Sequence, residues 1–429
     1  MPANDEEIGT SMPSLTFLGR LLAVPVVTTA LLVPAGAAAA APGDVAQSPP
    51  GHQNQREALQ NALDAVVEAG VPGVIAEVRD ERGVWRGSSG VANVHHEREP
   101  RKDGRFRVGS VTKTFVATTV LQLVDEGDVE LNAPIERYLP GIIPGDQGIT
   151  VRQLLNHTSG LYNYTLDMFP GKTLKEVRRN IQELRFRTFQ PQELVDMAMR
   201  HEPEYQPPEN GSWYSNTNYV LLGMLIEEAT GNEPATEIRQ RIIRPLGMQH
   251  TSLPEWNPFI VGPNAHGYED FPEAPPLDVT TYSPSWARTA GAIISTTSDL
   301  NSFYDALLTG QLLPPELLQK MKTTTKLPGG LTYGLGLMSL PGCGGKIWGH
   351  TGGVPGFTTY SFTSPDGGTQ VTMSVTEGLT LAVTPKAARA LNNVLVTTFC
   401  EAAPTTSVTP QPQDVPTATV PDLAQLPRP

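Results

Sequence analysis

Apolar and polar positions divide the chain into strand-like ends and a helical middle. Gly73–Asp80 and Gly83–Val91 are strand-like runs around a short turn at Glu81-Arg82, which predicts a β-hairpin. Turn residues at 365–368 and a helix at Thr384–Phe399 are expected near the other end. Four further strand-like runs surround that turn or precede it: Leu331–Leu340, Lys346–Gly349, Phe357–Thr363 and Thr369–Thr376.

The middle of the chain favours helices. Val111–Glu126 is apolar on most faces and stops at Gly127, a residue suited to a helix C-terminus. Thr217–Thr230 also ends at a glycine, and two shorter segments favour helix: Gln192–Arg200 and Ile238–Arg244. Strands at both ends with helices between them predict an α/β (α+β) fold. In that fold an antiparallel sheet is flanked by helices and built from both chain ends, with a mostly helical domain inserted.

The first 41 residues have the order of a secretory signal peptide. Arg20 precedes the apolar run Leu21–Ala35, and small residues follow at Ala37–Ala41. The competing interpretation is a membrane anchor, which two prolines within the run and its short length disfavour. We therefore expect a secreted, extracellular bacterial protein, with Met1 or Met12 as its start.

Composition sets the remaining boundaries. Residues 42–56 are polar and Pro-rich, as in a flexible leader, and residues 402–429 form a Pro/Thr-rich tail that cannot bury a core. The folded domain is expected at 57–401, with a sheet region at 57–108 and 287–401 and a helical region at 109–286.

Charge and cysteine usage narrow the class of protein. The 429 residues carry a net charge of −13 without a basic run, which argues against nucleic-acid binding. In an exported chain, the two cysteines, Cys343 and Cys400, are expected to form a disulfide. The pair His95-His96 lies in a polar stretch and favours a surface position, so neither a metal nor another cofactor is expected.

The first candidate for chemistry is Ser110 with Lys113. Ser110 begins the apolar helix, and Lys113 follows one turn later on the same face, within reach of the serine oxygen. A neutral lysine can accept the serine proton, and a charged one can stabilise the alkoxide. The alternative is an N-cap serine with a surface lysine, but an unpaired lysine in a buried helix is costly.

The second candidate is Tyr214-Ser215-Asn216, between a turn-rich segment and a helix. If a cationic Lys113 is close, the pKa of the Tyr214 phenol falls and a phenolate base becomes feasible. Asn216 can donate to a substrate carbonyl. The alternative is a helix cap beside an ordinary buried tyrosine.

The third candidate is His350-Thr351-Gly352, on a strand-like segment that continues with Gly353. Paired glycines allow a ligand to approach the backbone. The amides of Gly353 and Ser110 are candidate donors to a substrate oxyanion. A strand end followed by a turn is the alternative when this motif is taken alone.

Together the motifs S-x-x-K, Y-x-N and H-T-G, in this order, resemble those of penicillin-recognising serine hydrolases, the class C β-lactamase and DD-peptidase superfamily. His350 replaces the usual lysine of the third motif. The similarity is strongest to the secreted D-alanyl-D-alanine carboxypeptidases of Streptomyces and covers residues 57–401. The placement of the two cysteines carries part of this similarity. The rest is carried by six segments: 105–113, 121–127, 167–169, 214–218, 285–287 and 333–337.

The resemblance implies an acyl-enzyme at Ser110 and a monomer without cofactors that reacts with β-lactams. Its implied substrates are a peptidoglycan stem peptide or another D-amino-acid peptide or ester. It also implies that Phe169 and Trp286 wall the substrate cleft, where core packing is the alternative for both. The carboxypeptidases hold the substrate's terminal carboxylate with an arginine and a threonine, but Met338 and Gly353 stand there in this chain. Arg288 is a candidate replacement cation.

The missing anchor keeps other activities open. The two replaced anchor residues favour the alternative of an esterase, a D-aminopeptidase or a β-lactamase on the same scaffold. A third alternative is a catalytically silent sensor of penicillin or peptidoglycan. The complete set of three motifs argues against a silent protein.

Overall fold

The computed structural model describes residues 50–145, 148–169, 173–204, 211–271, 274–327, 331–380 and 385–400. The expected signal peptide (1–41), most of the expected leader and the tail at 402–429 lie outside these residues. The chain divides into two units, Met1–Gln47 and Ser48–Pro429, and every described residue belongs to the second. None of the helices in the described stretches combines the length and apolar character that a membrane span requires.

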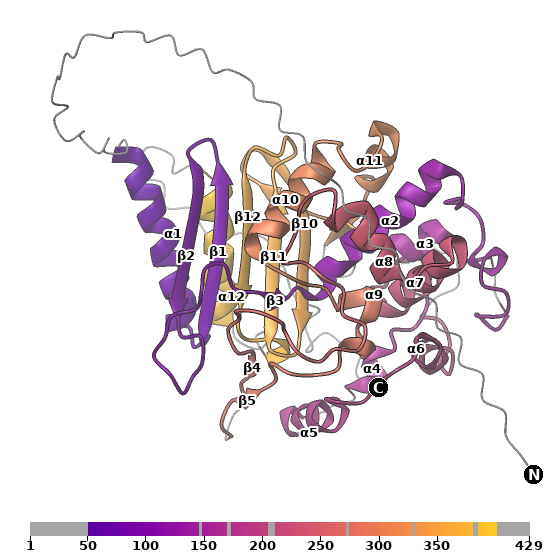
Figure 1. Ribbon diagram of the computed structural model, residues 1–429, viewed down its shortest axis with the longest axis horizontal. Helices are drawn as coiled ribbons and strands as arrows, with labels where there is room; N and C mark the ends of the chain where they lie inside the picture. The colour runs from indigo at the N-terminus through magenta and orange to yellow at the C-terminus, as the bar shows by residue number, and fades with distance from the viewer. Residues whose placement is uncertain are drawn as a thin grey trace, which may run out of the picture. The chain divides into compact units, whose positions relative to one another are not determined.

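An antiparallel sheet forms the centre of the described part, with strand order β2-β1-β12-β11-β10-β9-β8-β7 (Figure 1). β1 pairs with β12 in the register Val74↔Val375, so strands from the two chain ends are neighbours, as predicted. Two short pairs, β3 with β6 and β4 with β5, lie outside this sheet. The strand bounds are β1 Gly73–Asp80, β2 Gly83–Gly90, β3 Phe106–Arg107, β4 Tyr268–Glu269, β5 Leu277–Asp278, β6 Ile294–Ser295, β7 Thr325–Lys326, β8 Thr332–Tyr333, β9 Met338–Gly342, β10 Gly345–Val354, β11 Phe357–Thr363 and β12 Gln370–Val375.

One face of the sheet is covered by α1 (Pro50–Glu68) and α12 (Pro385–Phe399) (Figure 1). The buried residues of α1 recur with helical spacing at Leu59, Ala62, Leu63 and Val66, and they share a core with β1, β12 and α12. Residues 50–56 were expected to belong to a flexible leader, but they form the first turns of α1. Its apolar face is buried against the sheet and against α12, which comes from the far end of the chain.

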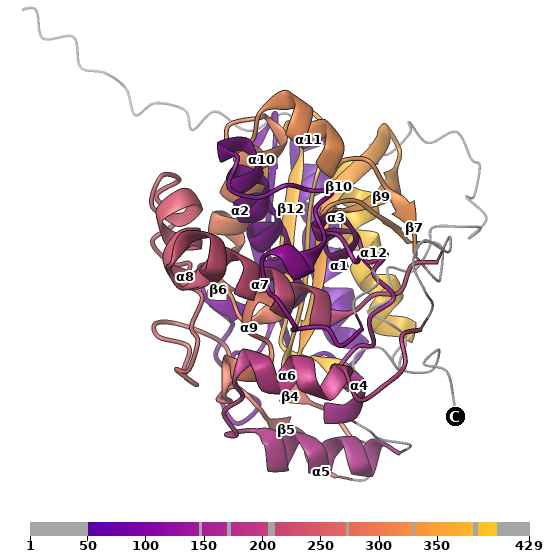
Figure 2. The same ribbon diagram turned by 90° about the vertical axis from the view of Figure 1, so that its right-hand side faces the viewer.

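The other face carries the helical region, with α7, α8 and α9 in front of the sheet in Figure 2. The predicted helices are present as α2 and α7, which end at Gly127 and Gly231 in left-handed conformation, as expected. Phe115 of α2 stacks on Phe303 of α10 with ring centroids 3.7 Å apart. The helix bounds are α2 Thr112–Glu126, α3 Val151–Leu155, α4 Thr165–Met168, α5 Leu174–Leu184, α6 Pro191–Ala198, α7 Asn216–Thr230, α8 Pro234–Ile238, α9 Arg288–Gly291, α10 Thr297–Leu308 and α11 Pro315–Met321.

Two strand predictions are wrong in extent. The run Leu331–Leu340 is two strands, β8 and β9, because the chain turns between them where the amide of Gly334 bonds to the carbonyl of Leu337. The run Lys346–Gly349 is only part of β10, which continues to Val354 through the paired glycines. The glycines mask strand character in the sequence, and pairing with β11 supplies it.

Cys343 and Cys400 form the predicted disulfide, with their Cα atoms 5.2 Å apart. The bond joins the β9–β10 turn to the residue that follows α12. It closes a sequence separation of 57 residues. In the chain-entropy model such a loop stabilises the fold by about 4 kcal/mol.

A buried acid after β12 makes stability depend on pH. Glu377 is 5% exposed, and burial together with the charge of Glu269 raises its pKa from 4.5 to about 7. Asp270 acts in the same direction, and a hydrogen bond from Thr380 acts against it. The folded chain therefore keeps a proton that the unfolded chain releases at lower pH.

We expect the free energy of unfolding to fall by roughly 3 kcal/mol as the pH rises from about 4.5 to about 7 because of this group. Glu377→Gln should remove the fall, matching wild type near pH 5 and exceeding its stability near pH 8. Urea denaturation at the two pH values measures this difference. The same pH dependence in both proteins would contradict the assignment to Glu377.

Candidate active site

Ser110 lies in a tight turn whose backbone packs closely against strand β10. The 3-10 turn Gly109–Val111 leads into α2, and Gly109 has a φ of 57°. A Cβ on Gly109 would lie 2.7 Å from the amide nitrogen of Gly353, and one on Gly352 would lie 1.9 Å from the carbonyl oxygen of Val108. Glycine at both positions is therefore required for the backbones to approach, which brings Ser110 beside Gly353.

Lys113 is fully buried and directed at Ser110. Its Nζ lies 3.0 Å from Ser110 Oγ, 2.7 Å from Asn216 Oδ1 and 2.7 Å from the carbonyl oxygen of Ala290. Burial lowers the pKa of Lys113 well below its usual value. A neutral amine has two N–H bonds, which the two carbonyl-type oxygens accept, and its lone pair then faces the Ser110 hydroxyl. This is the arrangement of a general base.

Tyr214 contacts the same serine and lies close to Lys113. Its ring centroid is 4.9 Å from Lys113 Nζ. Burial raises the pKa of the Tyr214 phenol, and a hydrogen bond to Ser110 acts against that shift. The predicted phenolate is therefore disfavoured, because burial opposes the charge on both groups. Tyr214 is a neutral phenol, able to pass a proton rather than to start the reaction as an anion.

The four groups that would meet a substrate are partly exposed, whereas those behind them are buried. Ser110, Tyr214, Asn216 and Gly353 all retain some solvent contact. Lys113 and His350, in contrast, have no exposed surface, and Thr351 is 6% exposed. The structure thus brings the three sequence motifs together and separates the residues that can touch a ligand from those that support them.

His350 occupies a supporting position. Its Nε2 lies 2.9 Å from the hydroxyl of Tyr333, and its Nδ1 contacts the carbonyl oxygen of Thr351. Burial and the nearby Lys113 lower the pKa of His350 to about 3, so the imidazole is neutral. A catalytic role was expected for His350. Within the described residues, however, its ring bonds to Tyr333 and Thr351 and not to Ser110.

A second histidine, His157, belongs to the site and was missed in the sequence. Its Nδ1 accepts hydrogen bonds from the backbone amide of Ser215 and from the side-chain amide of Asn218, each at 3.2 Å. Its ring lies 4.2 Å from that of Tyr214, centroid to centroid. His157 therefore orients the start of α7, which carries Asn216. Its only sequence signal was a polar residue soon after the apolar run Val151–Leu155.

Phe169 and Trp286, which were expected to line the walls of the substrate cleft, contact each other. The rings of Phe169 and Trp286 are T-shaped with centroids 5.4 Å apart. Phe169 follows α4, whose Thr165 hydroxyl accepts from the Asn216 side chain at 3.4 Å. Trp286 lies in the 3-10 turn Pro284–Trp286, four residues before the carbonyl that holds Lys113. Both residues therefore lie within four positions in the sequence of a residue that bonds to Asn216 or Lys113.

Met338 and Arg288 are the two residues on which the carboxylate anchor was expected to depend. Met338 is 5% exposed, and its sulfur accepts from Thr351 Oγ1 at 3.6 Å. The Arg288 guanidinium lies over the Trp256 ring, 5.0 Å from its centroid, and faces the charge of Glu255. The expectation that Arg288 supplies this cation receives no support from these contacts.

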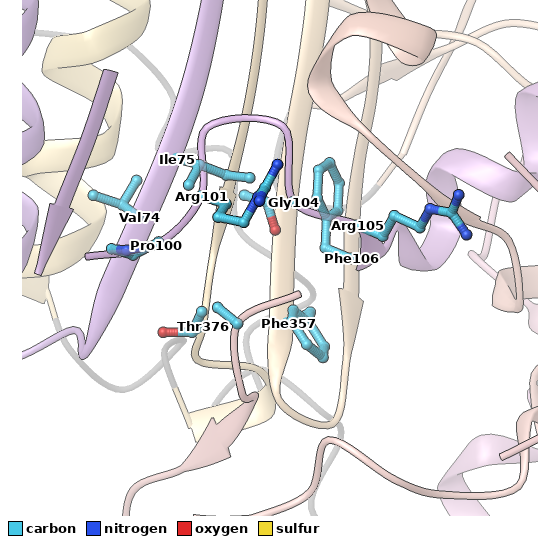
Figure 3. A pocket seen from close by; sticks show the side chains of 11 residues that line it. Val74, Ile75, Pro100, Arg101, Gly104, Arg105, Phe106, Phe357 and Thr376 are labelled. Carbon is cyan, nitrogen blue, oxygen red and sulfur yellow. The ribbon is translucent and has the colours of Figure 1, made fainter. Parts of the chain in front are cut away.

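Two hollows in the described part lie apart from Ser110. The cavity in Figure 3, lined by Ile75, Phe106 and Phe357 among others, holds about 10 Å³, which leaves room for one water at most. A wider open hollow of about 450 Å³ is lined by residues such as Arg185 and Asp278. Neither is lined by a motif residue, so the chemistry rather than cavity size identifies the site.

Comparisons with known proteins identify the family and the fold. A sequence model of the beta-lactamase family matches residues 56–395. Penicillin-binding protein 4* of Bacillus subtilis is 30% identical over 323 residues, which cover 72% of this chain and 68% of that protein. The crystal structure of a D-stereospecific amidohydrolase from Streptomyces sp. is similar with a TM-score of 0.71 and 38% identity, covering 81% of this chain and 99% of that one. D-amino acid amidase from Ochrobactrum anthropi SV3 is similar with a TM-score of 0.70 and 29% identity, covering 80% and 98%.

Proposed function

Since this chain belongs to the beta-lactamase family of serine hydrolases, we propose that it cleaves an amide bond on the carbonyl side of a D-amino acid through an acyl-enzyme at Ser110. The observation that carries the proposal is the contact of a buried Lys113 with Ser110 Oγ at 3.0 Å. The D-stereospecific amidohydrolase and the D-amino acid amidase among its neighbours favour the D-configured acyl group.

Acylation begins with proton transfer from the Ser110 hydroxyl to the lone pair of Lys113. Ser110 Oγ attacks the substrate carbonyl carbon, and the amides of Ser110 and Gly353 hold the oxyanion. As the C–N bond breaks, Tyr214 gives its proton to the leaving nitrogen and regains one from Lys113. Asn216 orients the substrate amide. Water then attacks the acyl carbon and gives a proton to the same groups, which return it to Ser110 Oγ as the bond between Oγ and the acyl carbon breaks, and the free acid leaves.

The leaving group distinguishes this proposal from a D-alanyl-D-alanine carboxypeptidase. A carboxypeptidase must hold a terminal carboxylate, and a buried Met338 beside Thr351 offers no charge for it. The carboxypeptidase remains the second candidate, because penicillin-binding protein 4* is a relative at 30% identity. Turnover of a peptide ending in D-Ala-D-Ala, its D-Ala amide and a simple D-alanyl ester separates the two, with the L-configured amide as a control.

We expect Met338→Arg combined with Gly353→Thr to raise kcat/KM for the D-Ala-D-Ala acid, relative to its amide, by about tenfold to hundredfold. The reason is that a restored charge-assisted hydrogen bond contributes roughly 1.5 to 3 kcal/mol. Met338→Gln with the same Gly353→Thr change is the matched uncharged control. An unchanged acid-to-amide ratio would show that these positions do not face the substrate carboxylate.

We also propose that the protein is exported. The basic, apolar and small residues in order at 20–41 support it, and the Cys343–Cys400 disulfide suits an oxidising compartment. The intact mass of protein recovered from culture medium tests this proposal, because export predicts loss of about the first 41 residues.

A further inference from the structure

The buried carboxylate of Glu269, on β4, joins two loops. Its Oε1 accepts from the amides of Gly356 at 2.9 Å and Leu379 at 2.8 Å. Its Oε2 accepts from the Thr380 amide at 2.8 Å and hydroxyl at 2.9 Å. Glu269 has no exposed surface, and burial raises its pKa while these hydrogen bonds act in the opposite direction. All four donors are satisfied by one ionised, acceptor-only side chain.

One of the two loops is the turn that follows the oxyanion strand. β10 and β11 close at the pair Val354↔Phe357, so Gly356 lies in the turn, three residues after Gly353. The packing there is tight, because a Cβ on Gly356 would lie 2.9 Å from the Cα of Gly267. Figure 3 shows Phe357, the first residue of β11, against the small cavity beside this turn. Glu269 therefore ties the end of β10 to β4.

The strand register shows why this matters for Gly353. Hydrogen-bonded and non-hydrogen-bonded pairs alternate in an antiparallel ladder. Two residues separate Val354 from Phe357, and a two-residue hairpin turn closes on a hydrogen-bonded pair, so the next pair, Gly353↔Thr358, is not hydrogen-bonded. The Gly353 amide then points away from β11, toward the side on which the Ser110 turn lies. The position of the Gly353 amide therefore depends on how rigidly the β10–β11 turn is fixed.

We propose that Glu269 is a positioning residue that sets the oxyanion amide of Gly353 by anchoring the β10–β11 turn. This role rests on the proposed acyl-enzyme mechanism at Ser110. Glu269 does not touch the substrate, and it acts only through Gly356 and the strand end. An oxyanion donor must lie about 2.7 to 3.1 Å from the developing charge, so a small shift of the strand weakens transition-state binding more than substrate binding.

The test compares Glu269→Gln with Glu77→Gln. A glutamine at 269 can accept on one side only, and its NH2 group would face donors on the other. Glu77 is an equally buried acid that accepts from Arg79 at 2.7 Å and Arg86 at 2.6 Å, in β1 rather than beside the hairpin. It is a matched control for the loss of a buried carboxylate.

The readout is the affinity for a D-alanine-like boronic acid, which forms a tetrahedral adduct on a serine and fills its oxyanion site. For Glu269→Gln we expect the inhibition constant to rise by about tenfold to hundredfold, with KM for a D-alanyl ester changed by less than about threefold. Glu77→Gln should change neither. A boronate affinity reduced equally in both variants, or in neither, would overturn the role of Glu269.

Thr380→Val provides a milder variant if Glu269→Gln does not fold. It removes one donor to Glu269 and retains the Thr380 amide, so we expect a loss of boronate affinity of about twofold to tenfold. No loss in a folded Thr380→Val protein would contradict the proposal. Absence of boronate binding in the wild-type protein would instead reject the acyl-enzyme mechanism itself.

Discussion

Ser110→Ala should abolish covalent labelling by a fluorescent penicillin and lower kcat/KM for a D-amino-acid amide by about 10⁴-fold or more. The Ser110 oxygen is the atom that forms the acyl bond in the proposed mechanism. The neighbouring groups cannot replace it, because Lys113 has no exposed surface and a backbone amide nitrogen such as that of Gly353 is not nucleophilic. Gel fluorescence and mass spectrometry of the labelled peptide measure the result.

Thr112→Ser is a matched control for this variant. Thr112 is a fully buried hydroxyl residue next to the turn, and its Oγ1 accepts from the amide of Ile293 at 3.1 Å. A serine keeps that hydroxyl, so labelling should remain. An adduct on any residue other than Ser110, or persistent labelling of Ser110→Ala, would reject the assignment of the nucleophile.

Tyr214→Phe should lower the acylation rate by about 10² to 10⁴, the range for loss of a general acid–base group. Burial keeps the phenol of Tyr214 protonated, so its role is to deliver a proton to the leaving nitrogen. Substrates with good leaving groups need that proton less, and the loss should therefore be smaller for an activated ester than for an amide. Stopped-flow acylation with both substrates measures the two rates.

The pH profile separates Tyr214 from Lys113. Acylation requires neutral Lys113, so its rate should fall as the pH drops through the pKa of Lys113, which burial lowers. Because this acidic limb belongs to Lys113, it should persist in Tyr214→Phe. Equal rates for Tyr214→Phe and wild type on the amide would mean that the proton passes through Lys113 alone.

Local patterns were sufficient for several elements. Strand β1 and strand β11 have the predicted bounds, and the helix predicted to end at Gly127 does so. These segments combine a clear apolar pattern with a glycine or turn signal at the end, and both features act over a few residues. The identities of Ser110 and Lys113 as partners followed from the same local geometry, since one helical turn separates them.

Contacts between distant segments decided what local patterns could not. The apolar face of helix α1 packs against α12, from the far end of the chain, and against the sheet, and the strand predicted at Leu331–Leu340 is broken by its turn. His157 reaches the site through Ser215, 58 residues away in the sequence. No periodicity within one segment carries information about such a pairing.

The sequence alone determined the fold class, the order of the three motifs and the pair of cysteines that bond. Those conclusions depend on residue type and short spacing. Only the tertiary structure decided the charge states, because burial disfavours the cation at Lys113 and the phenolate at Tyr214 alike. It also showed the ring of His350 hydrogen-bonded to Tyr333, and it brought Glu269 of β4 to the amide of Gly356 in the β10–β11 turn, 87 residues along the chain. Solvent exclusion and long-range hydrogen bonds exist only once the chain has folded.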